Sequence, residues 1–143
     1  AGLITKERVA QLVSVGRVVL CAALSSKRGL ALALPPMNPR EESAGACVSV
    51  EAREGVETGI SAADRARTLK VLAATENPRH DLVNPGHIFP FAAAEGGVLY
   101  RSGVVEGISD LLHLSGLSSV GAFIQLLNDK GELPTGTELR QIG

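Results

Sequence analysis

Apolar residues near the start of the chain first follow a helical period and then form a continuous run. Over residues 6–16 they recur at the spacing of one helix face, with Thr5 as a candidate N-cap and Gly16 at the end. This face carries Val9, Leu12 and Val13. The pattern predicts a helix over 6–16, and the apolar run of residues 17–24 predicts a buried strand after it.

The middle of the chain changes pattern three times. Residues 30–45 combine an apolar start with three prolines and a charged turn, which predicts a long irregular connection. Residues 46–52 alternate between apolar and polar and predict a strand. Ser61, followed three residues later by Asp64, is typical of a helix start, and the apolar period continues to about residue 74.

The last third of the chain predicts a strand, a helix and a strand. Residues 96–101 and 120–127 are apolar and strand-like, and residues 104–117 repeat with a helical period. The predicted apolar face of this helix consists of Val105, Ile108, Leu111 and Leu112. Because strands alternate with helices, we expect one domain over residues 1–143, of the α/β or α+β class, with a mixed β-sheet covered by helices.

The composition excludes some partners and indicates the kind of core. Aromatic residues make up only 3% of the 143 residues, so we expect a core of mainly valine, leucine, isoleucine and alanine. A net charge of -1 gives no electrostatic case for nucleic acid or an anionic membrane. No apolar run is long enough to span a bilayer and no signal peptide is evident, which predicts a cytoplasmic protein. Cys21 and Cys47 are expected to be buried free thiols.

The first candidate for chemistry is His87. It follows Pro85 and Gly86, whose restricted and permissive backbones suit a fixed turn. A histidine held there could donate or accept a proton near neutral pH. It could equally hydrogen-bond to the backbone and brace the turn, and the residues alone leave both roles open.

A second candidate site lies where a strand-like stretch leads into a helix. Arg101, Ser102 and Gly103 precede the helix start, where free backbone N–H groups, the helix dipole and a guanidinium would together hold a phosphate or a carboxylate. Thr58, just before the helix of residues 61–74, marks a similar opening. Glu106 in the first helical turn either complements the dipole or takes part in catalysis.

Several long motifs carry a resemblance to a known family. The stretch NPGHIFPF…GGVLYRSGVVEG, with GVETGISAADRARTLK before it and LLHLSGL and LLNDKGELP after it, resembles the 3,4-dihydroxy-2-butanone 4-phosphate synthase family of riboflavin biosynthesis. The resemblance extends over nearly all of the chain. The resemblance implies the fold of that family. It also implies a reaction that uses a divalent cation and converts ribulose 5-phosphate to formate and a four-carbon dihydroxybutanone phosphate. It also implies a homodimer with sites near the subunit boundary.

The chain departs from the family pattern at several positions of the implied metal and substrate site. Val104 stands where the resemblance places a metal-binding histidine, and Val105 stands at the neighbouring threonine. Gln125 replaces a late acidic residue, and the family's early acidic loop has no counterpart after Ala1. Since valine offers no oxygen or nitrogen ligand, we expect no metal and no other cofactor.

Three functions remain open at this point. The first is a repurposed, metal-independent enzyme acting on a small anionic or partly apolar substrate. The second is a non-catalytic remnant or subunit, and the third is the parental synthase activity. In the first case we expect His87 and Glu106 to be catalytic. The expected substrate-binding residues are Arg101, Ser102, Gly103, Val104, Val105, Thr58 and Gln125.

Overall fold

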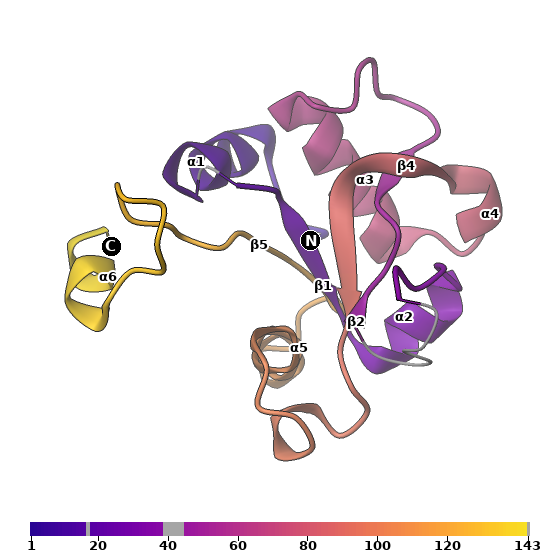
Figure 1. Cartoon of the computed structure of the whole chain (residues 1–143). Coiled ribbons are helices and arrows are strands. Elements are labelled where there is room, and N and C mark those ends of the chain that lie inside the picture. The colour runs from indigo at the N-terminus through magenta and orange to yellow at the C-terminus, as the bar shows by residue number, and fades with distance from the viewer. Residues whose placement is uncertain (17, 39–44, 143) are drawn as a thin grey trace.

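The structure is a computed structural model that describes residues 1–16, 18–38 and 45–142 (Figure 1). The helices are α1 (Lys6–Gly16), α2 (Ser26–Leu32), α3 (Ala62–Ala74), α4 (Pro78–Asp81), α5 (Val104–Leu114) and α6 (Gly136–Ile142), with a 3₁₀ turn η1 (Gly97–Leu99). The strands are β1 (Cys21–Leu24), β2 (Gly45–Ala46), β3 (Val50–Ala52), β4 (Leu82–Ala92) and β5 (Val120–Phe123). Among the described residues, no helix is both long and apolar enough to cross a membrane.

The long strand β4 organises the sheet. It pairs in parallel with β1, which pairs on its other edge with β5 in antiparallel orientation, and β2 pairs with the end of β4. The resulting order is β2-β4-β1-β5, and β3 pairs with the first part of β4 away from this path. Figure 1 shows β4 arching through the middle of the molecule. The predicted class, a mixed sheet covered by helices, is confirmed.

Helices cover this sheet and bury an aliphatic core. α3 packs against β3, β4 and β5, α1 packs against α3, and α5 packs against β1 and β5. The buried cluster consists of Val9, Leu20, Ala22, Leu24, Leu32, Val50, Ala66, Leu69, Leu72, Leu82, Ile88 and Val120. Cys21 and Cys47 are buried and free, as predicted, and burial raises the pKa of the Cys21 thiol to about 11. The expected aliphatic composition of the core is therefore confirmed.

The helices with local start signals form where the sequence predicts them. The Thr5 hydroxyl accepts the N–H of Arg8 at 3.3 Å, and Ser61 accepts the N–H of Asp64 at 3.0 Å. The helix predicted over 104–117 ends at Leu114. Its predicted apolar face was wrong at Leu111, which is 66% exposed. Ile108 and Leu112 do face the sheet, as their contacts with the position of Gly121 in β5 show.

Several predicted strands differ from the structure. The strand predicted over 96–101 was wrong: Gly96 and Gly97 adopt left-handed φ values of 90° and 60°, and η1 follows. Such a backbone cannot continue a strand, and glycine permits it at little cost. Residues 46–52 are split between β2 and β3, and the strand predicted over 120–127 ends at Phe123.

Two further differences concern the first half of the chain. Of the run 17–24, only Cys21–Leu24 forms a strand, and residue 17 lies outside the described residues. The irregular segment predicted over 30–45 overlaps α2, because Ser25 caps a short helix through the N–H of Arg28. The charged part of that segment, residues 39–44, lies outside the described residues.

Candidate functional site

His87 lies within β4 rather than on a turn, so the turn prediction was wrong. Gly86 serves a different purpose there: a Cβ on it would lie 2.1 Å from the carbonyl carbon of Val50. Glycine therefore allows β3 and β4 to approach closely. The N–H of Gly86 donates to the hydroxyl of Ser49 at 3.2 Å. This close approach brings the His87 side chain onto β3.

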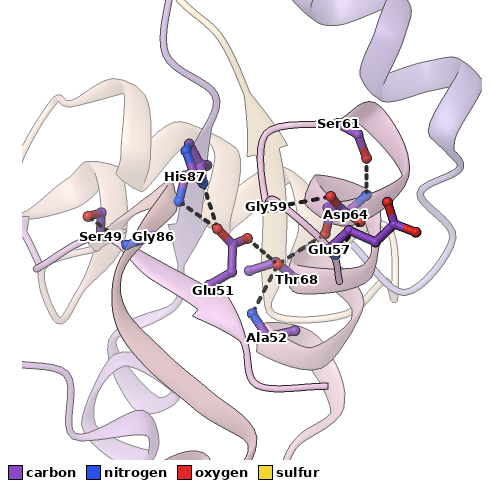
Figure 2. Close-up of polar contacts among 10 residues, drawn as sticks. All are labelled: Ser49, Glu51, Ala52, Glu57, Gly59, Ser61, Asp64, Thr68, Gly86 and His87. Carbon is purple, nitrogen blue, oxygen red and sulfur yellow. Dashed lines mark hydrogen bonds and ion pairs between the residues drawn. The ribbon is translucent and has the colours of Figure 1, made fainter. Parts of the chain in front are cut away.

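His87 is paired with a buried carboxylate of β3 (Figure 2). Its Nδ1 lies 2.7 Å from Oε2 of Glu51, and its backbone N–H donates to the same oxygen at 3.2 Å. The Glu51 side chain is 10% exposed, whereas that of His87 is 41% exposed. One ring nitrogen of His87 is thus held by a carboxylate while part of the ring reaches solvent.

The second oxygen of Glu51 is fixed by α3. The hydroxyl of the fully buried Thr68 donates to Oε1 of Glu51 at 2.9 Å and accepts the N–H of Ala52 at 3.1 Å. Both carboxylate oxygens therefore have partners, and the orientation of Glu51 is set by neighbours on two elements. Burial of such a polar group costs free energy unless it is hydrogen-bonded, and Glu51 meets this condition at both oxygens.

The loop before α3 covers the contact between His87 and Glu51. Gly59 has a left-handed φ of 79°, and a Cβ on it would lie 1.9 Å from Oε2 of Glu51 and 2.7 Å from Nδ1 of His87. Thr58, the predicted ligand in this loop, is exposed. The structure thus brings the loop of Thr58 next to His87, an arrangement that their separation in the sequence did not indicate.

A second cluster forms beyond the far end of β4, where Arg101 meets Glu106. Oε1 of Glu106 accepts Nε of Arg101 at 2.9 Å, Nη2 at 2.5 Å and the N–H of Ala94 at 2.8 Å. Glu106 is 1% exposed. Burial raises the pKa of its carboxyl, but the hydrogen bonds from Arg101 and Ala94 outweigh burial, so the pKa lies below its usual value.

The other residues predicted for this second site lie around the start of α5. Gly103 is the N-cap, and a Cβ there would lie 2.1 Å from Oε2 of Glu106, so only glycine fits above that carboxylate. Ser102 is exposed, Val104 is 69% exposed and Val105 is half-buried. Gln125 is exposed, two residues after the end of β5.

Glu51 and Thr68 are the site residues that the sequence analysis missed. Glu51 is separated from His87 by 36 positions, so no local motif links the two residues. The available signal was an acidic residue inside an otherwise apolar strand, since every residue of β3 is buried. A charge in that position needs a partner in the fold.

The chain's own residues do not fit the divalent cation that the resemblance implies at α5. Mg²⁺ takes oxygen ligands, and the side chain at the ligand position, Val104, is hydrocarbon. The nearby Glu106 is buried against Arg101. Within residues 1–16, 18–38 and 45–142, no group of three His, Cys, Asp or Glu side chains is arranged to hold a metal ion.

Comparison with known proteins places this fold and these motifs in one class of biosynthetic enzymes. The family model for 3,4-dihydroxy-2-butanone 4-phosphate synthase matches residues 1–143. The chain therefore belongs to the 3,4-dihydroxy-2-butanone 4-phosphate synthase family. A synthase of this name from Shewanella sediminis is 39% identical over 146 residues, covering 100% of the chain and 67% of the relative. The riboflavin biosynthesis protein RibBA of Salinispora tropica is 43% identical over 136 residues, covering 93% of the chain and 34% of the relative.

Solved structures agree with this assignment. The synthase from Candida albicans aligns with a TM-score of 0.89 at 35% identity, covering 99% of this chain and 71% of that chain. A two-domain synthase, RibBX of A. baumannii, aligns with a TM-score of 0.87 at 33% identity, covering 96% of this chain and 41% of that one. A further synthase, solved in complex with two magnesium ions, aligns with a TM-score of 0.77 at 37% identity, over 88% of this chain and 60% of that one.

The chain spans about two thirds of the length of the Shewanella relative and about a third of the Salinispora relative. Nothing therefore follows from the missing acidic loop. The disagreement with the implied metal site rests on Val104, which lies inside the matched residues.

Proposed function

We propose that this chain provides an acid–base centre in which His87 moves a proton on a small anionic hydroxy-carbonyl substrate, without a divalent cation at α5. The observation that carries this proposal is the 2.7 Å contact between Nδ1 of His87 and the buried carboxylate of Glu51. A carboxylate on Nδ1 favours the tautomer whose Nε2 is free to accept a proton. The exposure of the His87 ring leaves room for a substrate there.

Arg101 is proposed to orient a charged group of the substrate. Glu106 engages its Nε and Nη2, and the Arg101 side chain is 44% exposed, so Nη1 lies outside the pair. Ser102 and Gly103 at the start of α5 would add polar contacts, and Val104 and Val105 would add an apolar surface. This combination favours a substrate that is anionic at one end and partly apolar at the other.

The other predicted site residues take supporting roles in this proposal. Thr58 would contact the substrate from the loop next to His87, and Gln125 would do so from the segment after β5. Glu106 was predicted to be catalytic. Its burial and its three hydrogen bonds favour a role in holding Arg101 and the loop that contains Ala94.

Two other functions have a specific observation in their favour. The valines at the family's ligand positions also favour a non-catalytic subunit. Membership of the family favours the parental reaction, in which ribulose 5-phosphate yields formate and the four-carbon phosphate. The parental reaction requires a cation to stabilise developing oxyanions, and Val104 cannot bind one. We therefore place both functions behind the acid–base proposal.

Deuterium uptake by ribulose 5-phosphate in D₂O separates the three functions. We expect the protein to catalyse exchange of the hydrogens next to the carbonyl and to release no formate. His87→Ala should slow exchange by about 10²–10⁴-fold, as for loss of a general acid or base. His80→Ala is the matched control, since His80 lies on α4 and pairs with Asp81 at 2.8 Å.

The remaining outcomes of this assay each contradict the proposal. Formate release that depends on Mg²⁺ or Mn²⁺ would establish the parental reaction. Binding of ribulose 5-phosphate without any exchange would establish the non-catalytic function. Equal exchange rates for the His87→Ala variant and the wild type would remove His87 from the chemistry.

A further inference from the structure

Asp64 connects the start of α3 to the loop that precedes it. Oδ2 of Asp64 accepts the N–H of Gly59 at 3.0 Å, and Oδ1 accepts the N–H of Glu57 at 3.4 Å (Figure 2). The residue is 7% exposed. Burial by itself raises the pKa of its carboxyl, but hydrogen bonds with the Ser61 side chain and with these backbone groups outweigh it, and the pKa lies below its usual value.

These hydrogen bonds hold the loop in place against His87. The space beside Gly59 is so narrow that a Cβ there would overlap Oε2 of Glu51 and crowd Nδ1 of His87. The Gly59 backbone therefore lies directly against the His87–Glu51 hydrogen bond. Without the Asp64 carboxylate, the N–H groups of Glu57 and Gly59 would lose their partner and the loop its anchor.

We propose that Asp64 is a positioning residue of the His87 site. It keeps Gly59 packed on the His87–Glu51 hydrogen bond, which excludes water from that bond and holds His87 in the tautomer with the proton on Nδ1. The consequence for catalysis rests on the function proposed above. The shielding itself is a property of the free protein and can be measured without a substrate.

The test measures the imidazole protons of His87 in protein labelled with ¹⁵N-histidine. In the wild type we expect a resonance for the Nδ1–H of His87 that exchanges slowly with water. Asp64→Asn keeps the size of the side chain but leaves one acceptor oxygen for the two backbone N–H groups, because the other oxygen becomes an NH₂ donor. We expect this variant to exchange the Nδ1 proton about tenfold faster or more, because the loop opens more often.

Ser61→Ala is the matched control for helix stability. Ser61 caps the same end of α3 by accepting the N–H of Asp64 at 3.0 Å, so both substitutions should lower the melting temperature. Only Asp64→Asn replaces one of the two oxygens that accept the N–H groups of Gly59 and Glu57 by an NH₂ group, which cannot accept. Faster exchange in Asp64→Asn than in Ser61→Ala supports the positioning role. Equal exchange in the two variants, or no detectable slow proton in the wild type, overturns it.

Gly59→Ala provides a second variant if Asp64→Asn does not fold. Its methyl group would overlap Oε2 of Glu51, so the loop must move away while the Asp64 carboxylate remains. We expect the same faster exchange of the Nδ1 proton, and unchanged exchange would contradict the proposal. Because no substrate is used, a protein with a shielded His87 but no deuterium uptake by ribulose 5-phosphate would refute the proposed function and leave the role of Asp64 intact.

Discussion

The buried carboxylate of Glu106 and the partly exposed guanidinium of Arg101 form an ion pair, with Nη2 of Arg101 2.5 Å from Oε1 of Glu106. The charge that the sequence offers as an anion anchor is thus already partly balanced within the chain. The pair also joins the start of α5 to the loop at Ala94 through a third hydrogen bond to the same oxygen. Glu106 is consequently important for stability whatever the substrate.

Replacing Glu106 with glutamine should lower the free energy of unfolding at pH 7. Because Arg101 is 44% exposed and solvent screens it, we expect a loss of about 1–2 kcal/mol, below the range for a fully buried pair. Urea unfolding of the variant and the wild type measures this loss of free energy. Glu132→Gln, at an exposed position, is the control for the change in net charge. A Glu106→Gln protein as stable as the control would show that the pair contributes nothing.

The Glu106 carboxylate should also make the free energy of unfolding depend on pH. The folded protein lowers the pKa of Glu106, so it binds fewer protons than the unfolded chain, and stability rises with pH over that range. The contribution of Glu106 is complete above about pH 4.3 and is lost as the pH falls through the lowered pKa. Urea unfolding measured from pH 7 to pH 3 should therefore show that acid lowers the free energy of unfolding less in Glu106→Gln than in the wild type. Parallel curves would contradict this explanation.

Gly86→Ala should destabilise the junction between β3 and β4. The added methyl group would meet the Val50 carbonyl at 2.1 Å, and backbone atoms cannot move aside as a flexible side chain can. We expect a loss of about 1–3 kcal/mol or more. Gly136→Ala is the control, because nothing lies within 4 Å of a Cβ at that position. Thermal unfolding of the two variants side by side measures the difference, and similar melting temperatures would contradict the close approach.

The chain should hold no stoichiometric divalent cation of its own. Calorimetric titration of the 143-residue protein with Mg²⁺ or Mn²⁺ should give no saturable heat, because Val104 supplies no ligand at α5 and Glu106 is engaged by Arg101. One ion bound per chain, and lost on substitution of Glu106, would contradict this prediction. It would also favour the parental synthase reaction over the acid–base proposal.

The homodimer implied by the family resemblance stays a prediction. Leu99 in η1, Tyr100 just after it and Leu114 in α5 are 97%, 78% and 81% exposed. Exposed large apolar side chains favour an interface with another subunit. We expect light scattering to give the mass of a dimer, and Leu114→Glu to shift the protein toward a monomer. A wild-type monomer at micromolar concentration would refute the predicted dimer.

How much of this structure the sequence predicts depends on how local each signal is. Ser61 and Asp64 lie three residues apart, and the helix that they start was predicted correctly. β4 was not predicted, because Pro85 and Gly86 are typical of a turn, whereas here the glycine allows another strand to approach. The partner of His87 lies 36 positions away, so the pair becomes visible only when β3 and β4 are placed side by side.

The central claim is that His87 and Glu51 act as one proton-transfer unit. A double-substitution cycle of deuterium uptake by ribulose 5-phosphate tests it most directly, with wild type, Glu51→Gln, His87→Ala and the double variant compared at equal folded fraction. If the two residues act together, each single variant slows exchange and the double variant is no slower than His87→Ala, since Glu51 acts only through the imidazole. Wild-type exchange in Glu51→Gln, or single effects that multiply in the double variant, would contradict it.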